Sequence, residues 1–488
     1  MKKRNTWETY DEDQMKEVDL FADEYRNFLD EGKTERECVD YIINAAQEQG
    51  YRELQDVMNK GEELKEGDKV YAACMNKAVA LFRIGKRPMA EGMNILGAHI
   101  DSPRLDIKQN PLYEDGGFAY LDTHYYGGVK KYQWVTIPLS LHGVIVKKDG
   151  TTVELNIGEN EDDPVFFISD LLVHLSQEQL EKKASKVIEG EALDLIIGSK
   201  PFIFGREKAE DKEGTGEDIP KKDKKAKKNK NRAKEAVKKG ILEILKKNYD
   251  VEEDDFLSAE LEVVPAGKAR EAGLDRSMIL GYGQDDRVCA FSSLKAMFEV
   301  EESDRTACCL LVDKEEVGSI GATGMRSQFF ENTLAEVMNL TGEYTELNLR
   351  RCLASSCMLS SDVSSAYDPI FAASFDKKNV AYLGGGMVFN KFTGSGGKSG
   401  SNDANPEYFA HLRQIFEEEK VNFQTAELGR VDLGGGGTIA YILALYGMNV
   451  IDSGVAVLNM HAPWEATSKA DVYEAKRGYV AFLKGANM

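Results

Sequence analysis

The feature that most constrains the fold is a pattern that repeats from about residue 270 to the end of the chain. Short apolar runs are followed by a glycine or acidic turn, and then by a segment whose apolar residues have helical spacing. This alternation is typical of a doubly wound α/β fold, in which helices cover both faces of a sheet. Because 488 residues exceed the size at which one compact core usually stops growing, we expect more than one domain.

The first half of the chain contains both helical and strand-like patterns. Residues 12–50 carry apolar groups three and four positions apart, which predicts helix. Residues 95–100 predict a buried strand that delivers His99 to its end. Residues 132–158 alternate between apolar and polar side chains, like two strands joined by a Lys-Asp-Gly turn, and this texture differs from that of the flanking segments.

Composition narrows the class of protein. With 62 basic and 83 acidic residues the net charge is -21, which disfavours nucleic acid or an anionic membrane as the main partner. We find neither a secretion signal nor a stretch long enough to span a bilayer, so we predict a cytoplasmic protein. The chain has seven cysteines, and Cys308 and Cys309 are adjacent in an apolar run. This usage predicts reduced core thiols and no disulfide framework.

Residues 206–240 form a segment of mixed charge with almost no large apolar side chain. Such a composition cannot compensate the entropy of its own ordering, so we predict a flexible, solvated loop. Nucleic-acid binding by its lysines is the lesser alternative, because acidic residues are mixed into the same segment.

Several short apolar runs end at residues that can bind a metal ion. These residues are His99 with Asp101, Glu315 with Glu316, Asp362, and His461. A further pair, Asp285 and Asp286, precedes a helix-like segment. In open α/β sheets, ligands gather beyond the carboxyl ends of the strands, so these ends could converge on one crevice.

Two histidines and several carboxylates are the ligand set expected for zinc, although the same set accepts cobalt or manganese. Five such ligands exceed what one catalytic zinc needs. Two divalent ions that share one bridging carboxylate are the simplest arrangement, and Asp285 is the bridge that we predict.

The adjacent glutamates suggest a hydrolytic reaction. On an extended segment Glu315 and Glu316 would point in different directions, so one could bind metal while the other acts as a general base on water. His99 and Asp101 would share one side of the chain, where one could bind a metal while the other orients it or joins it. Taken singly, each residue has a structural alternative, such as a hydrogen-bonded core histidine, a solvated acidic face or a helix N-cap. Their common position at strand ends favours metal-assisted amide hydrolysis.

Four motifs resemble those of the aspartyl aminopeptidase and aminopeptidase I family of dinuclear metallopeptidases. Residues 97–108, GAHIDSPRLDIK, are similar to its His-Thr-Asp-Ser-Pro motif, with Ile100 in place of threonine. DKEEVGS at 313–319 is close to its Glu-Glu-Val-Gly-Ser signature, YYGG at 125–128 to its Tyr-Gly-Gly segment, and HAPWE at 461–465 to its last histidine motif.

The resemblance implies a role for each matching residue. It makes Glu315 the general base and Asp101 the residue that orients His99. The implied metal ligands are His99, Glu316, Asp362 and His461, with Asp285 as the bridging ligand. It also implies that His174, in DLLVHLSQ, is offered to the active site of a neighbouring subunit. The alternative for His174 is a histidine on a helix surface.

The resemblance further implies a catalytic domain in two parts, 1–106 and 270–488, interrupted by a smaller β-rich domain over 107–269 that makes dimer contacts. It also implies assembly of the dimers into a dodecamer.

The chain departs from the family pattern at two places. Ser365 and Asp368 stand where the family often has histidines after its aspartate. Acid-specific members carry a lysine in a Gly-Pro-Val-Ile-Lys stretch, whereas here Asn390 is aligned with that lysine and Lys391 follows one step later. Preference for an acidic or a neutral N-terminal residue therefore stays open.

We predict a cytoplasmic, metal-dependent aminopeptidase that removes the N-terminal residue from peptides. One alternative is a metal-dependent deacylase or carboxypeptidase on the same core, and another is a non-catalytic oligomeric scaffold. Only an aminopeptidase requires a free substrate amine, and only a catalyst needs both Glu315 and the metal ligands.

Overall fold

The computed structural model describes residues 5–202 and 235–487, and these residues form two compact units. The large unit comprises Met1–Pro103, Tyr126–Val129 and Gly267–Met488, and the small unit comprises Arg104–Tyr125 and Lys130–Ala266. The sequence did not indicate that residues 126–129 would return to the large unit. The catalytic and dimerisation roles assigned to the domains from the sequence stay predictions.

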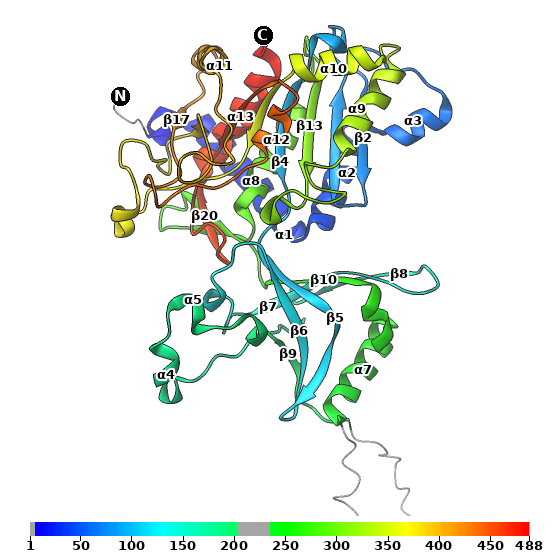
Figure 1. The fold of residues 1–488 in the computed structure, drawn as a ribbon, viewed down its shortest axis with the longest axis vertical. Coiled ribbons are helices and arrows are strands. Elements are labelled where there is room, and N and C mark those ends of the chain that lie inside the picture. Colours follow the sequence, from blue (N-terminus) through cyan, green and yellow to red (C-terminus); the bar gives the residue numbers. More distant parts are fainter. Residues whose placement is uncertain (1–4, 203–234, 488) are drawn as a thin grey trace, which may run out of the picture. The chain divides into compact units, whose positions relative to one another are not determined.

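The large unit is built on a mixed sheet, which has nine strands within the described residues (Figure 1). In spatial order they are β1 (Arg52–Glu53), β2 (Lys69–Cys74), β3 (Ala78–Arg83), β13 (Ala307–Val312), β4 (Asn94–His99), β14 (Cys357–Ser361), β18 (Asn449–Gly454), β16 (Met387–Asn390) and β17 (Phe423–Thr425). The central strands β13, β4, β14 and β18 are parallel, whereas β3 and β16 run against them. The predicted α/β fold is confirmed, and its main sheet is mixed.

Helices cover both faces of this sheet. On one face lie α1 (Glu12–Glu31), α2 (Glu35–Glu48), α8 (Gln284–Glu299), α11 (Pro406–Glu418) and α13 (Lys469–Gly485), and on the other α3 (Leu54–Lys60), α9 (Phe329–Leu340), α10 (Glu346–Ser355) and α12 (Ala440–Ala444). Cys309 packs in the first core and Cys308 in the second, as alternation along β13 requires. All seven cysteines are free thiols, and all but the partly exposed Cys74 are buried.

The predicted helical region 12–50 forms two helices because Gly32 ends the first one. Asp11 caps α1 and forms a capping box with Gln14, and Thr34 does the same for α2 with Glu37. The apolar residues of both helices face the sheet and pack in the same core as those of α8.

A second sheet in the large unit connects two segments that carry predicted site residues. Its strands, in order, are β11 (Arg270–Ala272), β12 (Met278–Gly281), β20 (Glu465–Ser468), β19 (Ala456–Leu458) and β15 (Ser364–Ser365). Asp285 follows β12, and His461 lies in the turn between β19 and β20. Because β12 pairs antiparallel with β20, the end of β12 and the start of β20 lie at the same end of the sheet. The segments that carry these two residues therefore meet there.

The small unit contains a separate sheet, which has six strands within the described residues. In order they are β8 (Thr152–Ile157), β7 (Leu139–Val146), β10 (Ala259–Pro265), β5 (Arg104–Asp115), β6 (Phe118–Tyr126) and β9 (Leu195–Gly198), accompanied by α4 (Gln177–Leu180), α5 (Ala184–Val187) and α7 (Ala236–Tyr249). The two strands predicted in 132–158 are β7 and β8, but Lys131–Gln133 form a 3-10 turn, η3.

The predicted loop 206–240 was wrong at its end, because residues 236–240 belong to α7. The part of it up to residue 234 lies outside the described residues. The remaining 3-10 turns are η1 (Thr6–Thr9), η2 (Met89–Glu91), η4 (Val173–Leu175), η5 (Gly190–Ala192), η6 (Glu253–Ser258), η7 (Glu315–Val317) and η8 (Pro369–Ser374).

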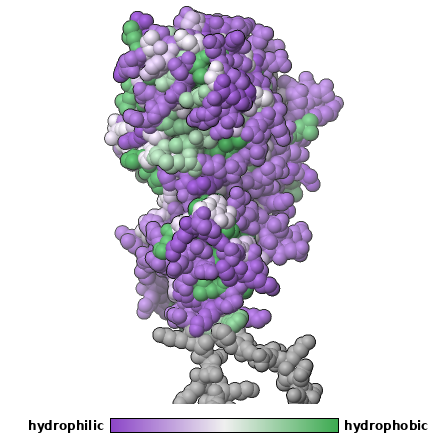
Figure 2. Space-filling model, turned by 90° about the vertical axis from the view of Figure 1, so that its right-hand side faces the viewer, coloured by the Kyte–Doolittle hydropathy of each residue, from purple (hydrophilic) through white to green (hydrophobic). Residues whose placement is uncertain are grey.

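The visible surface is largely hydrophilic. Hydrophilic residues cover most of the face seen in Figure 2. Over the described ranges, every helix is too short or too polar to cross a membrane.

Candidate metal centre

The carboxyl ends of parallel strands bring the predicted residues together at one edge of the main sheet. His99 ends β4 and pairs in register with Val312, which ends the neighbouring strand β13. Glu315 and Glu316 follow β13 after two residues, and Asp362 follows β14 on the other side of β4. The sheet therefore gathers four predicted site residues, as expected for ligands at the strand ends of an α/β sheet.

His99 is buried and is held by Asp101. Its Nδ1 lies 3.0 Å from the backbone carbonyl oxygen of Asp101 and 3.3 Å from that residue's Oδ1. The Oδ1 of Asp101 also accepts a hydrogen bond from the N–H of Glu315 at 3.1 Å, and its Oδ2 accepts one from the N–H of Glu316 at 3.2 Å. The hydroxyl of Tyr126 donates to Oδ2 at 2.8 Å. One carboxylate thus connects the histidine with the glutamate turn.

Asp285 lies between the two histidines. Its Oδ1 is 3.3 Å from Nε2 of His99, and its Oδ2 is 3.1 Å from Nε2 of His461. Asp285 and Asp286 have non-helical dihedral angles in the first turn of α8. The N–H of Asp285 donates to Oε2 of Glu465 at 3.1 Å. Each oxygen of the Asp285 carboxylate therefore faces a different imidazole.

The expectation that Glu315 and Glu316 lie on an extended segment was wrong, because they form the 3-10 turn η7. Both carboxylates reach the same centre, each beside a different histidine. Oε2 of Glu315 is 4.0 Å from Nε2 of His99, whereas Oε1 of Glu316 is 3.4 Å from Nε2 of His461. Lys314, with φ 71°, and Gly318, with φ 96°, flank the turn, and a positive φ at both positions keeps it tight.

His461 is held by its backbone and by its ring. Its φ is 64°, and its N–H donates to Oε1 of Glu465 at 2.7 Å. Its Nδ1 lies 3.0 Å from the carbonyl oxygen of Gly128. A Cβ atom at Gly128 would come within 3.1 Å of that Nδ1, so a glycine permits this close approach.

The potential ligand atoms form overlapping groups in which all atoms lie within 4.8 Å of one another. One group is His99, Asp285 and Asp362, and another is Asp285, Glu316 and His461. Asp285 belongs to both. A third group combines His99 with Glu315 and Glu316. The shared member makes the arrangement suitable for two cations that are close together.

The hydrogen bonds of the histidines fit a divalent cation. Nδ1 of each ring faces a backbone carbonyl oxygen, to which it can only donate. The Nε2 lone pair of each neutral ring then faces a carboxylate oxygen of Asp285. Two acceptors at such distances are stable only with a cation between them, which is either a proton on the ring or a metal ion. Metal-ligating histidines commonly donate their other N–H in this way.

The carboxylates also fit a cation. Burial raises the pKa of Glu316 and of Asp362 well above the ordinary range, and burial raises the pKa of Glu315 to about 7. Oε1 of Glu316 is buried and accepts no hydrogen bond from the described residues. Burial lowers the pKa of His461, but its contact with Asp285 outweighs this and raises the pKa to about 10. So many buried acidic groups in one place require compensating positive charge.

Comparison with known protein families identifies the family of this chain. The family model described as aminopeptidase I zinc metalloprotease (M18) matches residues 28–483. The chain belongs to this M18 family.

M18 relatives and solved structures match nearly the whole chain. A probable M18 family aminopeptidase 1 from Clostridium acetobutylicum is 60% identical over 480 residues, covering 98% of each sequence. The crystal structure of aminopeptidase I from Clostridium acetobutylicum matches with a TM-score of 0.87 and 58% identity, covering 99% of both chains. The M18 aminopeptidase structure from Thermotoga maritima matches with a TM-score of 0.89 and 40% identity, covering 99% of this chain and 100% of the other. The family resemblance predicted from the motifs is confirmed, and the chain is a zinc-dependent metallo-aminopeptidase.

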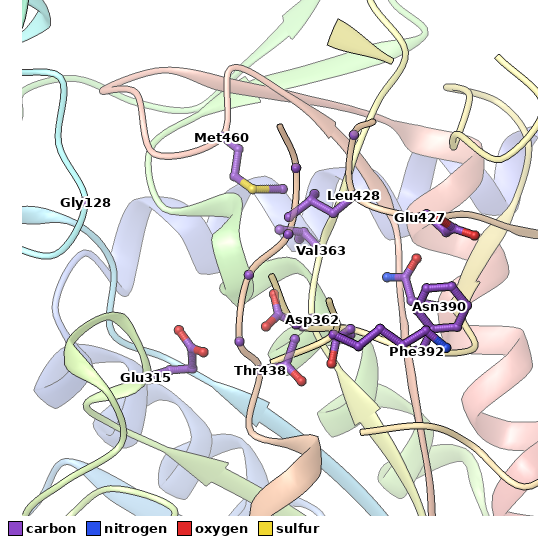
Figure 3. Close-up of a pocket in the computed structure, with 18 of the residues that line it drawn as sticks. Gly128, Glu315, Asp362, Val363, Asn390, Phe392, Glu427, Leu428, Thr438 and Met460 are labelled. Carbon is purple, nitrogen blue, oxygen red and sulfur yellow. The ribbon is translucent and has the colours of Figure 1, made fainter. Parts of the chain in front are cut away.

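The M18 centre opens into a cavity of about 680 Å³ that lies within the large unit. We call one side the donor wall, which consists of Asp285, Glu315, Glu316, Asp362 and His461. The other side, the glycine wall, consists of lining residues from two loops, 390–398 and 427–438. In Figure 3, Glu315 lies on one side of the cavity and Asn390 and Phe392 lie on the other, with Asp362 between them beside Thr438.

The structure shows the surroundings of residues at which this M18 chain departs from the family pattern. Asn390 is buried and lines the cavity, whereas Lys391 is exposed and does not. This agrees with the alternation of side chains at the end of β16. Asp368 accepts a hydrogen bond from the N–H of Ile370 at 2.9 Å and so caps η8.

One predicted site residue, His174, is expected at the active site of a neighbouring subunit. His174 belongs to the small unit, where it is exposed in η4 and lines a separate hollow of that unit. Its role stays a prediction. The alternative expected for His174 was a histidine on a helix surface, but the residue lies in a 3-10 turn.

Sequence reasoning missed three residues that hold the centre: Tyr126, Gly128 and Glu465. All three lie in the YYGG and HAPWE motifs, so the motifs contained the signal. Their contacts with Asp101, His461 and Asp285 depend on the fold and are not visible in the sequence.

Proposed function

We propose that this aminopeptidase holds two zinc ions, one on His99, Asp285 and Asp362 and the other on Asp285, Glu316 and His461. The observation that carries this proposal is that the two oxygens of Asp285 face Nε2 of two different histidines, at 3.3 and 3.1 Å. The two donor groups overlap at this residue alone. Cobalt or manganese would suit the same ligands.

Zinc ions bound at these positions would supply Lewis acidity to the scissile carbonyl and lower the pKa of water. In this proposal Glu315 is the general base. Its carboxylate lines the cavity beside His99 Nε2 and belongs to neither group that shares Asp285. Glu315 takes a proton from the attacking water at a carboxylate oxygen and then donates it to the departing amine. Asp101 keeps Glu315 in place through the N–H of that residue, and it keeps His99 in one tautomer.

In our proposal the enzyme removes neutral N-terminal residues in preference to acidic ones. This is supported by Asn390, an uncharged side chain, at the cavity position where acid-specific members carry a lysine. Lys398 also lines the cavity, but its Nζ lies 3.6 Å from the ring centroid of Phe392 and 3.6 Å from the Asp403 carboxylate. Lys398 therefore already has partners for its charge.

We also propose a homo-oligomer, built from dimers and extending to a dodecamer, in the cytoplasm. Support for self-association comes from the small unit, where Leu171, Leu172, Val173, Leu175 and Leu180 are exposed within one short stretch. A concentration of exposed apolar side chains marks an interaction surface. His174 lies in this stretch and would be presented to a neighbouring subunit there. Seven unpaired thiols support a reducing compartment.

The test of the proposed function uses paired peptides that begin with Leu or Glu, each with a free or an acetylated amine. We expect turnover of the free peptides only, with Leu preferred. Glu315→Gln should retain its zinc, measured by elemental analysis, and lose activity by about 10²- to 10⁴-fold. Equal cleavage of acetylated peptides would favour a deacylase, and full activity in Glu315→Gln would rule out its role as the base.

A further inference from the structure

Glu465 is a buried carboxylate whose two oxygens contact the backbone of the metal centre. Oε1 accepts the N–H of His461 at 2.7 Å, and Oε2 accepts the N–H of Asp285 at 3.1 Å. Its side chain is almost wholly inaccessible to solvent. One carboxylate therefore joins the backbones of two residues that are far apart in the sequence and whose side chains meet at the centre.

Neither of the two N–H groups is held by regular secondary structure. His461 has a φ of 64°, a left-handed conformation that is unfavourable for a residue with a side chain. Asp285 has φ -83° and ψ 106°, which are not helical angles, although it lies in the first turn of α8. Hydrogen bonds to Glu465 therefore help to fix the direction in which each backbone presents its side chain. Two further contacts act with them: the hydroxyl of Ser102 donates to the carbonyl oxygen of Asp285 at 2.9 Å, and Nδ1 of His461 lies 3.0 Å from the carbonyl oxygen of Gly128.

The geometry of these contacts requires two acceptors. A carboxylate offers an acceptor on each oxygen, whereas an amide of the same shape offers one oxygen and one NH₂ group. A glutamine at position 465 would place that NH₂ group against a backbone N–H. Both oxygens of Glu465 accept hydrogen bonds from backbone N–H groups. This residue therefore contacts the backbones of His461 and Asp285, whose side chains form the centre.

We propose that Glu465 is a positioning residue that sets the separation between the Asp285 carboxylate and the His461 imidazole. It thereby sets the affinity of the ion position formed by Asp285, Glu316 and His461. The inference rests on the two-ion arrangement of the proposed function. The position formed by His99, Asp285 and Asp362 depends less on it, because His99 is held separately by Asp101.

A purely structural role is the competing explanation. Glu465 begins β20 and pairs with Gly281 of β12, and its carbonyl oxygen accepts a hydrogen bond from Gln284 at 2.5 Å. A structural role predicts a loss of thermal stability with ion binding unchanged. Ion affinity, measured separately for each position, distinguishes the two explanations.

Asp471 provides a matched control in the same unit. It is also a buried carboxylate whose two oxygens accept backbone N–H groups, from Gly384 at 2.8 Å and from Gly386 at 2.7 Å. It belongs to none of the donor groups. Asp471→Asn removes one acceptor in the same way as Glu465→Gln, so it reports the cost of the chemical change alone.

The experiment is a titration of the metal-free full-length protein with Co²⁺, followed by visible absorption and by calorimetry. We expect the wild type and Asp471→Asn to bind two Co²⁺ ions per chain with the same affinities and spectra. Glu465→Gln should bind one ion normally and the other roughly 10- to 100-fold more weakly, with an altered spectrum for that ion. If Glu465→Gln does not fold, Glu465→Asp replaces it, because a shortened carboxylate cannot reach both N–H groups and should also weaken the second ion.

Two outcomes would overturn the inference in different ways. Two ions bound to Glu465→Gln, or to Glu465→Asp where that replaces it, with wild-type affinities and spectra would contradict the role of Glu465 alone. A single ion bound to the wild type would contradict the two-ion arrangement, and the inference with it.

Discussion

The two walls of the cavity are built on opposite principles. On the donor wall, charged side chains meet, and their backbones are held by other side chains, such as Asp101 and Glu465. On the glycine wall, backbones meet directly: the N–H of Gly394 donates to the carbonyl oxygen of Gly436 at 2.8 Å. A Cβ atom at Gly434 would lie 1.8 Å from the carbonyl oxygen of Leu428.

This difference indicates a division of labour. Substitutions on the donor wall should change ion binding and the chemical step. Substitutions on the glycine wall should change how the substrate fits while the ions remain bound. Ion content measured together with kinetics distinguishes the two kinds of effect.

The largest effect is expected from Asp285→Ala. It removes the carboxylate that both donor groups share, so both ion positions lose a ligand. We expect fewer than two ions per chain by elemental analysis and a fall in kcat/KM of about 10⁴-fold or more, as for loss of a central catalytic group. The control is Asp304→Ala, an exposed aspartate of the same unit, which should behave as wild type. An active Asp285→Ala enzyme with full ion content would contradict the role of Asp285 as the ligand that both ion positions share.

A smaller effect, on the other wall, is expected from Gly434→Ala. Its new Cβ atom would clash with the carbonyl oxygen of Leu428, so the loop 427–438 must move. We expect kcat/KM for a Leu peptide to fall by about 10²-fold, mainly through KM, with ion content unchanged. Gly397→Ala is the matched control, because a Cβ atom at Gly397 meets no atom within 4 Å. Loss of ions in Gly434→Ala would break the proposed separation of the walls.

Asn390→Lys should change the choice of substrate. A cation at this cavity position would attract an acidic N-terminal side chain and leave the donor wall intact. We expect the ratio of kcat/KM for Glu to Leu peptides to rise by about tenfold, which corresponds to roughly 1.4 kcal/mol. The control, Lys391→Asn, changes an exposed residue and should leave the ratio as it is. An unchanged ratio in Asn390→Lys would place the specificity elsewhere.

The smallest effect is expected from Thr438→Val. The hydroxyl of Thr438 donates to Oδ1 of the buried Asp452 at 2.5 Å. Burial raises the pKa of Asp452 to about 7, and this hydrogen bond opposes the rise. Loss of the donor should cost about 1–3 kcal/mol of unfolding free energy when the carboxyl is ionised.

The sign of the pH dependence follows from the raised pKa of Asp452. Its stabilising contribution is complete below the unfolded pKa, near 4, and is lost as the pH rises through about 7. Without the Thr438 hydroxyl the pKa rises further, so the Tm difference between the wild type and Thr438→Val should be larger at pH 8 than at pH 5.5. Thr341→Val, which removes a hydroxyl that donates to a backbone carbonyl oxygen, should show a difference that is the same at both pH values.

The sequence predicted the parts of the fold that depend on local pattern. The apolar run before His99 predicted β4, and parallel strand ends explained why His99, Glu315 and Asp362 should meet. These inferences worked because burial and alternation are written in consecutive residues.

The sequence could not predict contacts that depend on distant residues. The carbonyl oxygen of Gly128 faces His461 across 333 positions, and Glu465 reaches Asp285 across 180. The turn at Glu315 was mistaken for an extended segment, because the positive φ of Lys314 is not expected of a lysine. Tertiary contacts, which have no local signature, decide these features.

The most direct test of the two-ion centre is a crystal of the zinc-loaded protein with an anomalous difference map measured at the zinc absorption edge. We expect two peaks about 3.5–4 Å apart, each about 2.0–2.2 Å from a different oxygen of Asp285. One peak should lie beside His99 and Asp362, and the other beside Glu316 and His461. A single peak, or two peaks that do not share Asp285, would contradict it.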